Sequence, residues 1–308
     1  MKKLLVLHRL TPKLRELIEE RLGDRVELSF TPKDDTNIIL WGWGFGTELD
    51  FKKMKGLDFI QALPAGVGHL PFEKIPNVLL CSGSGALSRE IAEHAFSLIL
   101  CLSKNLKEHH KNLQKGILKQ DITSKTLKEK ILGIVGFGSI GREVALIGRG
   151  FGMKIWGINR RGISSFPCDF LSKAEELEEV LKDADVLVLT LPLTPKTLNL
   201  ISERELSMMK KDAILVNVSR GNIVDEGAIY HHLKENRQFQ FGTDVLWDYR
   251  NVYQNYPFFE LENFYMTPHV AARVENFEEK MMEVSIENVL RYLDGKKVKN
   301  VIDISNYK

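Results

Sequence analysis

The chain has 308 residues, 44% of them hydrophobic and 27% charged, with a formal net charge of +2. This composition is typical of a soluble globular protein with room for two domains. The small charge, without an arginine-rich or aromatic-interleaved basic stretch, argues against nucleic acid as a partner. No segment approaches the roughly 18 apolar residues of a membrane span. Three scattered cysteines predict neither a disulfide framework nor a metal site, and we expect a cytoplasmic protein.

The first hundred residues alternate apolar strands with helical segments. The apolar run after Lys2 has only four residues before His8, so it predicts a strand rather than a signal peptide. A helix should begin at Thr11 as N-cap, with Pro12 at its first position, and end at Gly23. Further strands are expected at 26–30, 38–40, 59–63 and 78–81, and one long helix at 88–115. This order predicts an open α/β domain.

A second series of strands begins at Ile131. Later strands are expected at 154–158, 185–190, 213–218, 239–245 and 264–266, with helices near 174–182, 203–209 and 225–235. A last amphipathic helix is expected at 275–293, and the tail 298–304 has strand character. We therefore predict two open, doubly wound parallel-sheet domains. One is a Rossmann dinucleotide-binding domain at 101–284; the other is a discontinuous, flavodoxin-like substrate domain at 1–100 and 285–308.

A glycine-rich turn directly follows the apolar strand at 131–135. Its sequence is Gly136-Phe-Gly138-Ser139-Ile140-Gly141. Gly136 permits a tight turn, Gly138 lets the backbone approach a pyrophosphate, and Gly141 lets the next helix pack closely. The phosphates would meet backbone amides at the start of that helix. This context predicts a dinucleotide site.

Three later loops lie just after predicted strands. Leu191 and Pro192 begin a proline-rich loop that can line an adenosine pocket. Arg220 offers a planar guanidinium suited to a carboxylate or keto oxygen. His269 follows the strand at 264–266. Because open α/β sheets bind ligands at this edge, the three loops together indicate an active site.

Residues 60–300 resemble the D-isomer-specific 2-hydroxyacid dehydrogenases, which include D-lactate, glycerate and phosphoglycerate dehydrogenases and hydroxypyruvate reductases. The matching stretches, in the family's order, are Ala92-Glu93-His94, 136–143, 191–197, 217–226 and 267–269. The resemblance implies a homodimer formed through the nucleotide domain, and a hinge between the two domains. It also implies cofactor contacts from residues in several of these loops: Leu191, Pro192, Thr197, Val218 and Ser219.

The resemblance also implies roles for individual site residues. Arg220 would bind the substrate carboxylate and carbonyl, and His269 would be the acid/base that protonates the carbonyl oxygen. Asp244 would contact the nicotinamide carboxamide. Backbone amides of the loop that contains Gly66 and Val67 would hold the substrate carboxylate.

Two positions depart from the family pattern. The family's glutamate, five residues after the aspartate that matches Asp244, is replaced by Tyr249, preceded by Asp248. Either Tyr249 stands in for the glutamate, or Asp248 does after a one-residue slip, or the site is inactive. The acidic residue expected to bind the adenosine ribose is Asn159, followed by Arg160 and Arg161. Two guanidinium groups can pair with a 2′-phosphate, which favours NADP over NAD.

The sequence thus predicts an oxidoreductase that transfers a hydride between NAD(P) and a small 2-keto or D-2-hydroxy acid, as a glyoxylate or hydroxypyruvate reductase does. One alternative is a dinucleotide-sensing protein without turnover, which loss of the glutamate would permit. Another is a formate-dehydrogenase-like enzyme of the same fold. That chemistry would need the asparagine and glutamine of that branch of the family, where this chain has Leu87 and Tyr249.

Overall fold

The computed structural model describes residues 1–44, 49–249 and 256–307. Within it the chain forms two compact units, one of residues 1–87 and 274–308 and one of residues 88–273. The predicted discontinuous organisation has the same plan, but its boundaries at 100/101 and 284/285 differ from those of the units. The helix α2 (Ser88–Ser103) packs on α4 (Ser139–Gly150), and the helix α8 (Phe277–Leu293) packs on α1 (Pro12–Leu22). Each helix therefore belongs whole to one unit.

The first unit is built on a five-stranded parallel sheet with the order β2-β1-β3-β4-β5. Its strands are β1 (Lys2–Leu7), β2 (Val26–Ser29), β3 (Ile38–Trp41), β4 (Phe59–Ala62) and β5 (Leu79–Cys81). This is the flavodoxin-like order that was predicted. As predicted, Thr11 caps α1 by accepting a hydrogen bond from the Leu14 backbone, with Pro12 as the first residue. Helices α1 and α8 cover one face of the sheet, and segment 49–75 together with the C-terminal tail covers the other.

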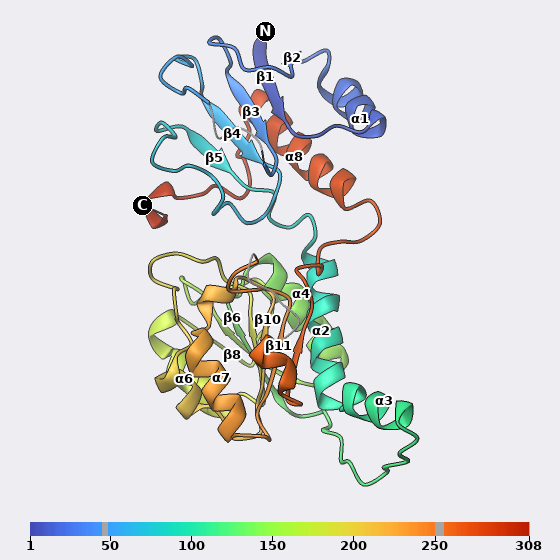
Figure 1. Cartoon of the computed structure of the whole chain (residues 1–308). Coiled ribbons are helices and arrows are strands. Elements are labelled where there is room, and N and C mark those ends of the chain that lie inside the picture. Colours follow the sequence, from blue (N-terminus) through green and yellow to red (C-terminus); the bar gives the residue numbers. More distant parts are fainter. Residues whose placement is uncertain (45–48, 250–255, 308) are drawn as a thin grey trace. The chain divides into compact units, whose positions relative to one another are not determined.

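The second unit contains a seven-stranded, all-parallel sheet with the order β12-β11-β10-β9-β6-β7-β8. Figure 1 labels β6, β8, β10 and β11 of this sheet. Its strands are β6 (Ile131–Val135), β7 (Lys154–Ile158), β8 (Phe170–Ser172), β9 (Val186–Leu189), β10 (Ile214–Asn217), β11 (Gln240–Thr243) and β12 (Phe264–Met266). Its other helices are α3 (Leu106–Gln114), α5 (Leu177–Asp183), α6 (Glu203–Met208) and α7 (Glu226–Glu235). The order reverses direction at β6, the point where a doubly wound sheet binds dinucleotides.

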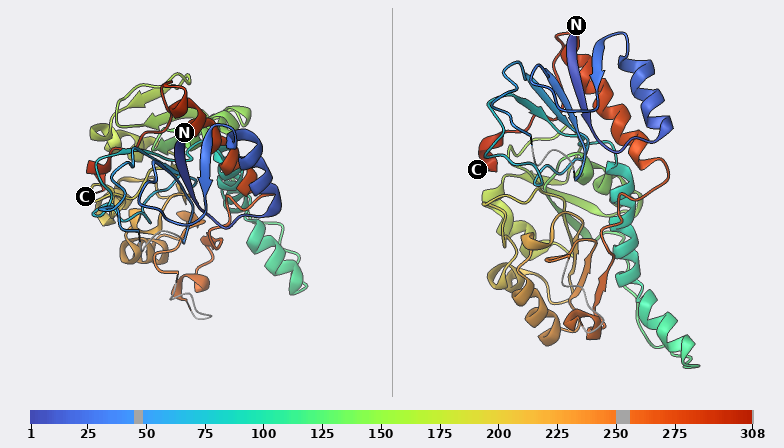
Figure 2. Two further views of the ribbon diagram at one scale, coloured as in Figure 1. Left: turned by 90° about the horizontal axis from the view of Figure 1, so that it is seen from above. Right: turned by 45° about the horizontal axis from the view of Figure 1, so that its top comes forward.

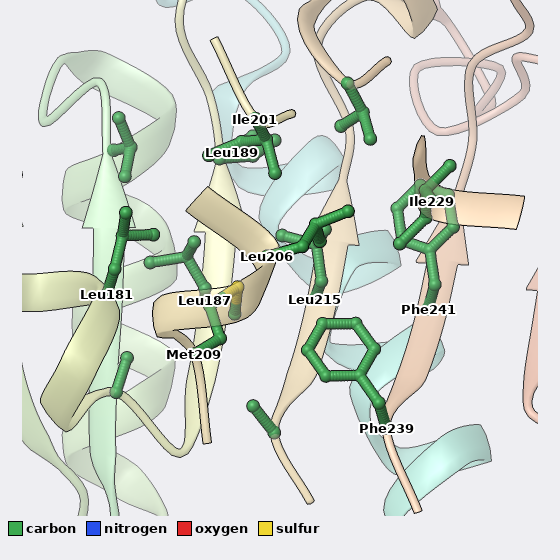
Figure 3. Close-up of a cluster of buried hydrophobic side chains, with 14 of the residues drawn as sticks. Leu181, Leu187, Leu189, Ile201, Leu206, Met209, Leu215, Ile229, Phe239 and Phe241 are labelled. Carbon is green, nitrogen blue, oxygen red and sulfur yellow. The ribbon is translucent and has the colours of Figure 1, made fainter. Parts of the chain in front are cut away.

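Both faces of this sheet are buried. A strand that is covered by helices on both sides is apolar along its whole length. In β9, Val186 and Val188 face the core beneath α2 and α4, while Leu187 and Leu189 face the opposite core. Figure 3 shows this second core, in which Leu187, Leu215 and Phe241 of the sheet meet Leu206, Met209 and Ile229 from the helical side. The strands that carry the site loops are therefore packed on both faces.

Two local expectations were wrong, and one strand was missed. The helix expected at 88–115 is two helices, α2 and α3, separated at Asn105, which has a left-handed φ of 49°. The tail at 298–304 forms an isolated antiparallel bridge between Val301 and Cys81 instead of a strand. The short strand β8 was not predicted, because three residues carry little periodicity. In the described part of the chain, no helix has the length and apolar character that crossing a membrane requires.

Candidate active site

The turn after β6 has the geometry that a pyrophosphate needs. Gly136 has a φ of +99°, and a Cβ at this position would lie 2.7 Å from the Leu191 nitrogen, so glycine is required. A Cβ at Gly141 would lie 3.0 Å from the Gly136 oxygen and from Ile134 Cγ2, which shows how closely α4 begins against β6. No such close atom surrounds Gly138, the residue before α4. The turn therefore leaves the backbone open to a phosphate at the helix N-terminus, with Ser139 and Ile140 as its first residues.

The loop after β9 lies against this turn. Thr190 Oγ1 donates to the Gly136 oxygen at 2.9 Å, which joins the ends of β9 and β6. Farther along, Thr197 Oγ1 donates to the Pro192 oxygen at 2.7 Å and accepts from the Thr194 backbone at 2.8 Å. Leu191, Pro192 and Thr197 thus belong to one hydrogen-bonded loop beside the glycine turn, and their contact with an adenosine stays a prediction.

Asn159 shapes the turn that follows β7. Its Oδ1 accepts from the backbone nitrogens of Arg161 at 2.9 Å and Gly162 at 2.8 Å. Its Nδ2 donates to the Ile163 oxygen at 2.9 Å. Arg160 and Arg161 are solvent exposed, and neither forms an ion pair with any residue that the structure describes. Asn159 therefore presents two guanidinium groups on a defined turn.

The turn that carries Arg220 is organised by Asn217, the last residue of β10. Asn217 is fully buried; its Oδ1 accepts from Ser219 Oγ at 2.6 Å and Ser219 N at 3.0 Å, and its Nδ2 donates to the Arg220 oxygen at 2.9 Å. The Arg220 guanidinium donates to the Ser219 oxygen at 2.6 Å. Val218 and Ser219, both expected at the cofactor, lie in this turn.

Asp244 follows β11 and lies beneath the loop that carries His269. Its carboxylate is 1% exposed. Oδ1 accepts from Thr267 Oγ1 at 2.6 Å and Val270 N at 2.9 Å, and Oδ2 accepts from Ala271 N at 2.8 Å. A carboxylate has about four lone-pair sites, so these three bonds leave room for the carboxamide contact expected of Asp244.

The side chains of Tyr249 and His269 form a pair at the surface of the second unit. Tyr249 Oη lies 2.8 Å from His269 Nδ1, and the ring centroids are 5.6 Å apart. This is the contact that the family's glutamate would make, and the geometry favours Tyr249 over Asp248 as the imidazole partner.

The surroundings of the pair oppose a charged imidazole. Partial desolvation lowers the pKa of His269, the positive charge of Arg220 lowers it further, and Asp244 acts in the opposite direction. Desolvation also raises the pKa of Tyr249, so its phenol is neutral at neutral pH. The site therefore combines Arg220, a neutral phenol and an imidazole whose uncharged form is favoured.

The predicted substrate loop belongs to the first unit. Gly66 and Val67 follow β4, and Val67 is 1% exposed, with its side chain packed in the core. The Val67 side chain is therefore not available to a ligand. The second unit brings together Arg220, Asp244, Tyr249 and His269.

Three polar residues that hydrogen-bond within the candidate site escaped the sequence reasoning. Asn217 and Thr267 were read only as parts of motifs, and His94 only as part of a matching stretch. In the structure His94 Nε2 lies 2.8 Å from Thr267 Oγ1 and 3.5 Å from Asp244 Oδ1. Asn217 and Thr267 are polar residues at the ends of buried strands, which was an available signal. His94 lies within α2, and no local pattern marks it.

Comparison with known proteins identifies the family. The model of the D-isomer specific 2-hydroxyacid dehydrogenase NAD-binding domain matches residues 96–271, more than half of the chain. The chain belongs to the D-isomer specific 2-hydroxyacid dehydrogenase family. The match confirms the predicted fold and the predicted class, an oxidoreductase of 2-hydroxy acids with a nicotinamide cofactor. The glycine turn at Gly136 fits the pyrophosphate of that cofactor.

Several curated relatives are glyoxylate reductases. The chain is 34% identical to that of Pyrococcus furiosus over 217 residues, which cover 68% of this chain and 64% of the relative. It is 33% identical to that of Thermococcus litoralis over 257 residues, or 80% of this chain and 77% of the relative. The D-3-phosphoglycerate dehydrogenase of Methanocaldococcus jannaschii is 29% identical over 262 residues, 83% of this chain and 49% of that protein.

Two solved structures extend the comparison. A Pyrobaculum aerophilum protein, described provisionally as a formate dehydrogenase, has a TM-score of 0.86 and 28% identity, with 100% of both chains covered. An acyclic imino acid reductase in complex with NADPH and D-Arg has a TM-score of 0.78 and 25% identity, covering 98% of this chain and 100% of that chain.

Proposed function

We propose that this protein reduces a small 2-keto acid to a D-2-hydroxy acid, or catalyses the reverse reaction, as its glyoxylate reductase relatives are named for doing. The observation that carries the proposal is the group of Arg220, Asp244, Tyr249 and His269 at the ends of adjacent strands in a unit of this family. Gly136, Gly138, Ser139, Ile140 and Gly141 would hold the pyrophosphate. When bound, the nicotinamide supplies the hydride, and the protein supplies position and charge.

Each site residue has a distinct proposed role. The Arg220 guanidinium binds the substrate carboxylate and orients its carbonyl. His269, in its protonated form, donates a proton from Nε2 to the carbonyl oxygen. Tyr249 accepts a hydrogen bond from Nδ1 of that ring and holds it in place. Backbone amides of Gly66 and Val67 are proposed as further carboxylate contacts of the first unit, which would be the substrate domain.

We further propose that NADP is preferred over NAD. Arg160 and Arg161 are exposed, the turn at Asn159 presents them, and neither has an ion-pair partner in the described part of the chain. The family's carboxylate is replaced by Asn159, which removes its repulsion of a 2′-phosphate.

A second candidate function is reduction of a 2-imino acid, suggested by the name of one structural relative. The Tyr249–His269 pair favours it, because the lowered pKa of His269 disfavours the protonated ring that keto acid reduction needs. An iminium carbon, by contrast, carries its own activating charge. Hydride addition to an iminium gives the amine directly and needs no proton from the protein. By contrast, the asparagine and glutamine required for formate oxidation are replaced by Leu87 and Tyr249.

We also propose a cytoplasmic homodimer. Helix α3 has no buried residue, and it extends away from the sheet of its own unit (Figure 2). Leu106, Leu113, Ile117 and Leu118 are 48–76% exposed on α3 and the segment after it. A second copy of this chain would cover these side chains. Light scattering of the wild type and of Leu113→Asp would measure the mass, and a monomeric wild type would refute the dimer.

One experiment tests the function and its alternatives. NADPH and NADH absorbance would be followed with glyoxylate, hydroxypyruvate, pyruvate and bulkier 2-keto acids, each with and without methylamine. Consumption with the keto acids alone supports hydroxy acid formation, and consumption only with the amine supports imino acid reduction. Cofactor binding without any turnover would identify a sensing protein and refute both reductase proposals.

A further inference from the structure

His94, Thr267 and Asp244 form a partly buried set of hydrogen-bonded side chains that connects helix α2 to the loop that carries His269. His94 lies on α2, which packs against β10 and β11. Its side chain is 21% exposed, and that of Asp244 is 1% exposed. Thr267 lies two residues before His269, so the hydrogen bonds of Thr267 act on His269 through the backbone of this loop.

The directions of these hydrogen bonds follow from the donors available. A threonine hydroxyl has one hydrogen, and Thr267 Oγ1 donates it to Asp244 Oδ1 at 2.6 Å. The contact of 2.8 Å between His94 Nε2 and Thr267 Oγ1 therefore has the histidine as donor. His94 must carry a hydrogen on Nε2.

The loop is tied on both sides of His269. Before it, Thr267 N donates to the Thr243 oxygen at 2.9 Å, and Thr267 Oγ1 is hydrogen-bonded to His94 and Asp244. After it, Val270 N and Ala271 N donate to the two oxygens of Asp244. His269 itself has a φ of +60°, a left-handed conformation that costs a non-glycine residue about 1–3 kcal/mol. Such a conformation persists only where the surroundings impose it.

We propose that His94 and Thr267 are positioning residues for His269, holding Asp244 and loop 267–271 so that the imidazole keeps its reactive orientation. The proposal rests on the proposed acid role of His269. Without the Thr267 hydroxyl, Oδ1 of Asp244 loses one of its two donors and the loop can relax from the left-handed conformation. A misplacement of about 1 Å at a reacting group can reduce the rate by about 100-fold.

The kinetic test compares paired variants in the full-length protein. Thr267→Val and His94→Ala should lower kcat for the reduced substrate by about 10- to 100-fold, while the KM for the keto acid changes little, because Arg220 binds the carboxylate. Thr267→Ser and His94→Gln keep a hydroxyl and a donor and should recover most of kcat. His231→Ala, exposed on α7, is the matched control. Wild-type kcat in both Thr267→Val and His94→Ala would overturn the proposal.

A spectroscopic test does not depend on turnover. In protein labelled with ¹⁵N-histidine, long-range ¹H–¹⁵N spectra at pH 8 report which ring nitrogen carries hydrogen. The signal lost in His94→Gln should show hydrogen on Nε2. The His269 signals should move in Thr267→Val but not in His231→Ala. An Nδ1–H form of His94, or unmoved His269 signals, would overturn the proposal even if no substrate were found. If the wild type gave the expected spectra but showed no turnover, only the proposed function would be refuted.

Discussion

Replacing Tyr249 with glutamate would restore the family's carboxylate beside His269. In the wild type, desolvation and the charge of Arg220 lower the pKa of His269, and the neutral phenol of Tyr249 provides no opposing charge. Reduction of a keto acid requires the protonated ring, so kcat/KM should fall as pH rises through this lowered pKa. The ordinary value is about 6.5, so the fall should be under way below neutral pH.

The size of the change follows from the geometry of the pair. A carboxylate about 4 Å from an imidazolium interacts by about 1 kcal/mol in water and about 4 kcal/mol at the effective dielectric of a protein surface. One pKa unit corresponds to about 1.4 kcal/mol. Tyr249 is 52% exposed, so solvent screens the pair and the lower part of this range applies. We therefore expect Tyr249→Glu to raise the midpoint of the profile by about 1–2 pH units.

The assay is kcat/KM for keto acid reduction from pH 5 to 9, with the buffer ionic strength held constant. Tyr230→Glu, which adds the same charge on α7, is the matched control and should leave the midpoint unchanged. Oxidation of the hydroxy acid needs the neutral ring and should show the opposite trend. The reasoning is refuted if the wild-type profile is flat through pH 8, or if Asp248→Asn moves the midpoint and Tyr249→Glu does not.

Three further substitutions test the other site elements. Arg220→Ala should lower kcat/KM for the keto acid by at least ~100-fold, since two charge-assisted hydrogen bonds are lost, while the cofactor Kd is retained. Arg220→Lys should not restore activity, and wild-type kinetics in Arg220→Ala would show that the residue does not bind the substrate. Arg160→Ala combined with Arg161→Ala should weaken NADPH by about tenfold with NADH little changed, and Asn159→Asp should favour NADH; tighter binding of NADH than NADPH by the wild type would contradict this. Gly136→Ala should abolish tight cofactor binding, measured by nicotinamide fluorescence, and lower Tm, because its Cβ would lie 2.7 Å from the Leu191 nitrogen; unchanged affinity would show that the turn does not hold the pyrophosphate.

Local sequence patterns were sufficient for the strands and for the glycine turn. The bounds predicted for 154–158 and 264–266 are those of β7 and β12, and both sheets are parallel as predicted. These features are local: apolar runs mark strands buried on both faces, and a tight turn with positive φ requires glycine at Gly136. The site loops could be placed at one edge because parallel strands share the direction of their carboxyl ends.

The sequence by itself determined the fold class, the family resemblance and the positions of Arg220 and His269 after their strands. Only the tertiary structure decided which groups act together. The contact between Tyr249 and His269 and the bonds from Asp244 to Thr267, Val270 and Ala271 join residues more than 19 positions apart, and His94 reaches Thr267 across 173 positions. The pattern of apolar residues likewise does not indicate that the long helix breaks at Asn105. The physical reason is that propensity and periodicity report on neighbours along the chain, whereas a hydrogen bond between loops depends on how separate strands are packed side by side.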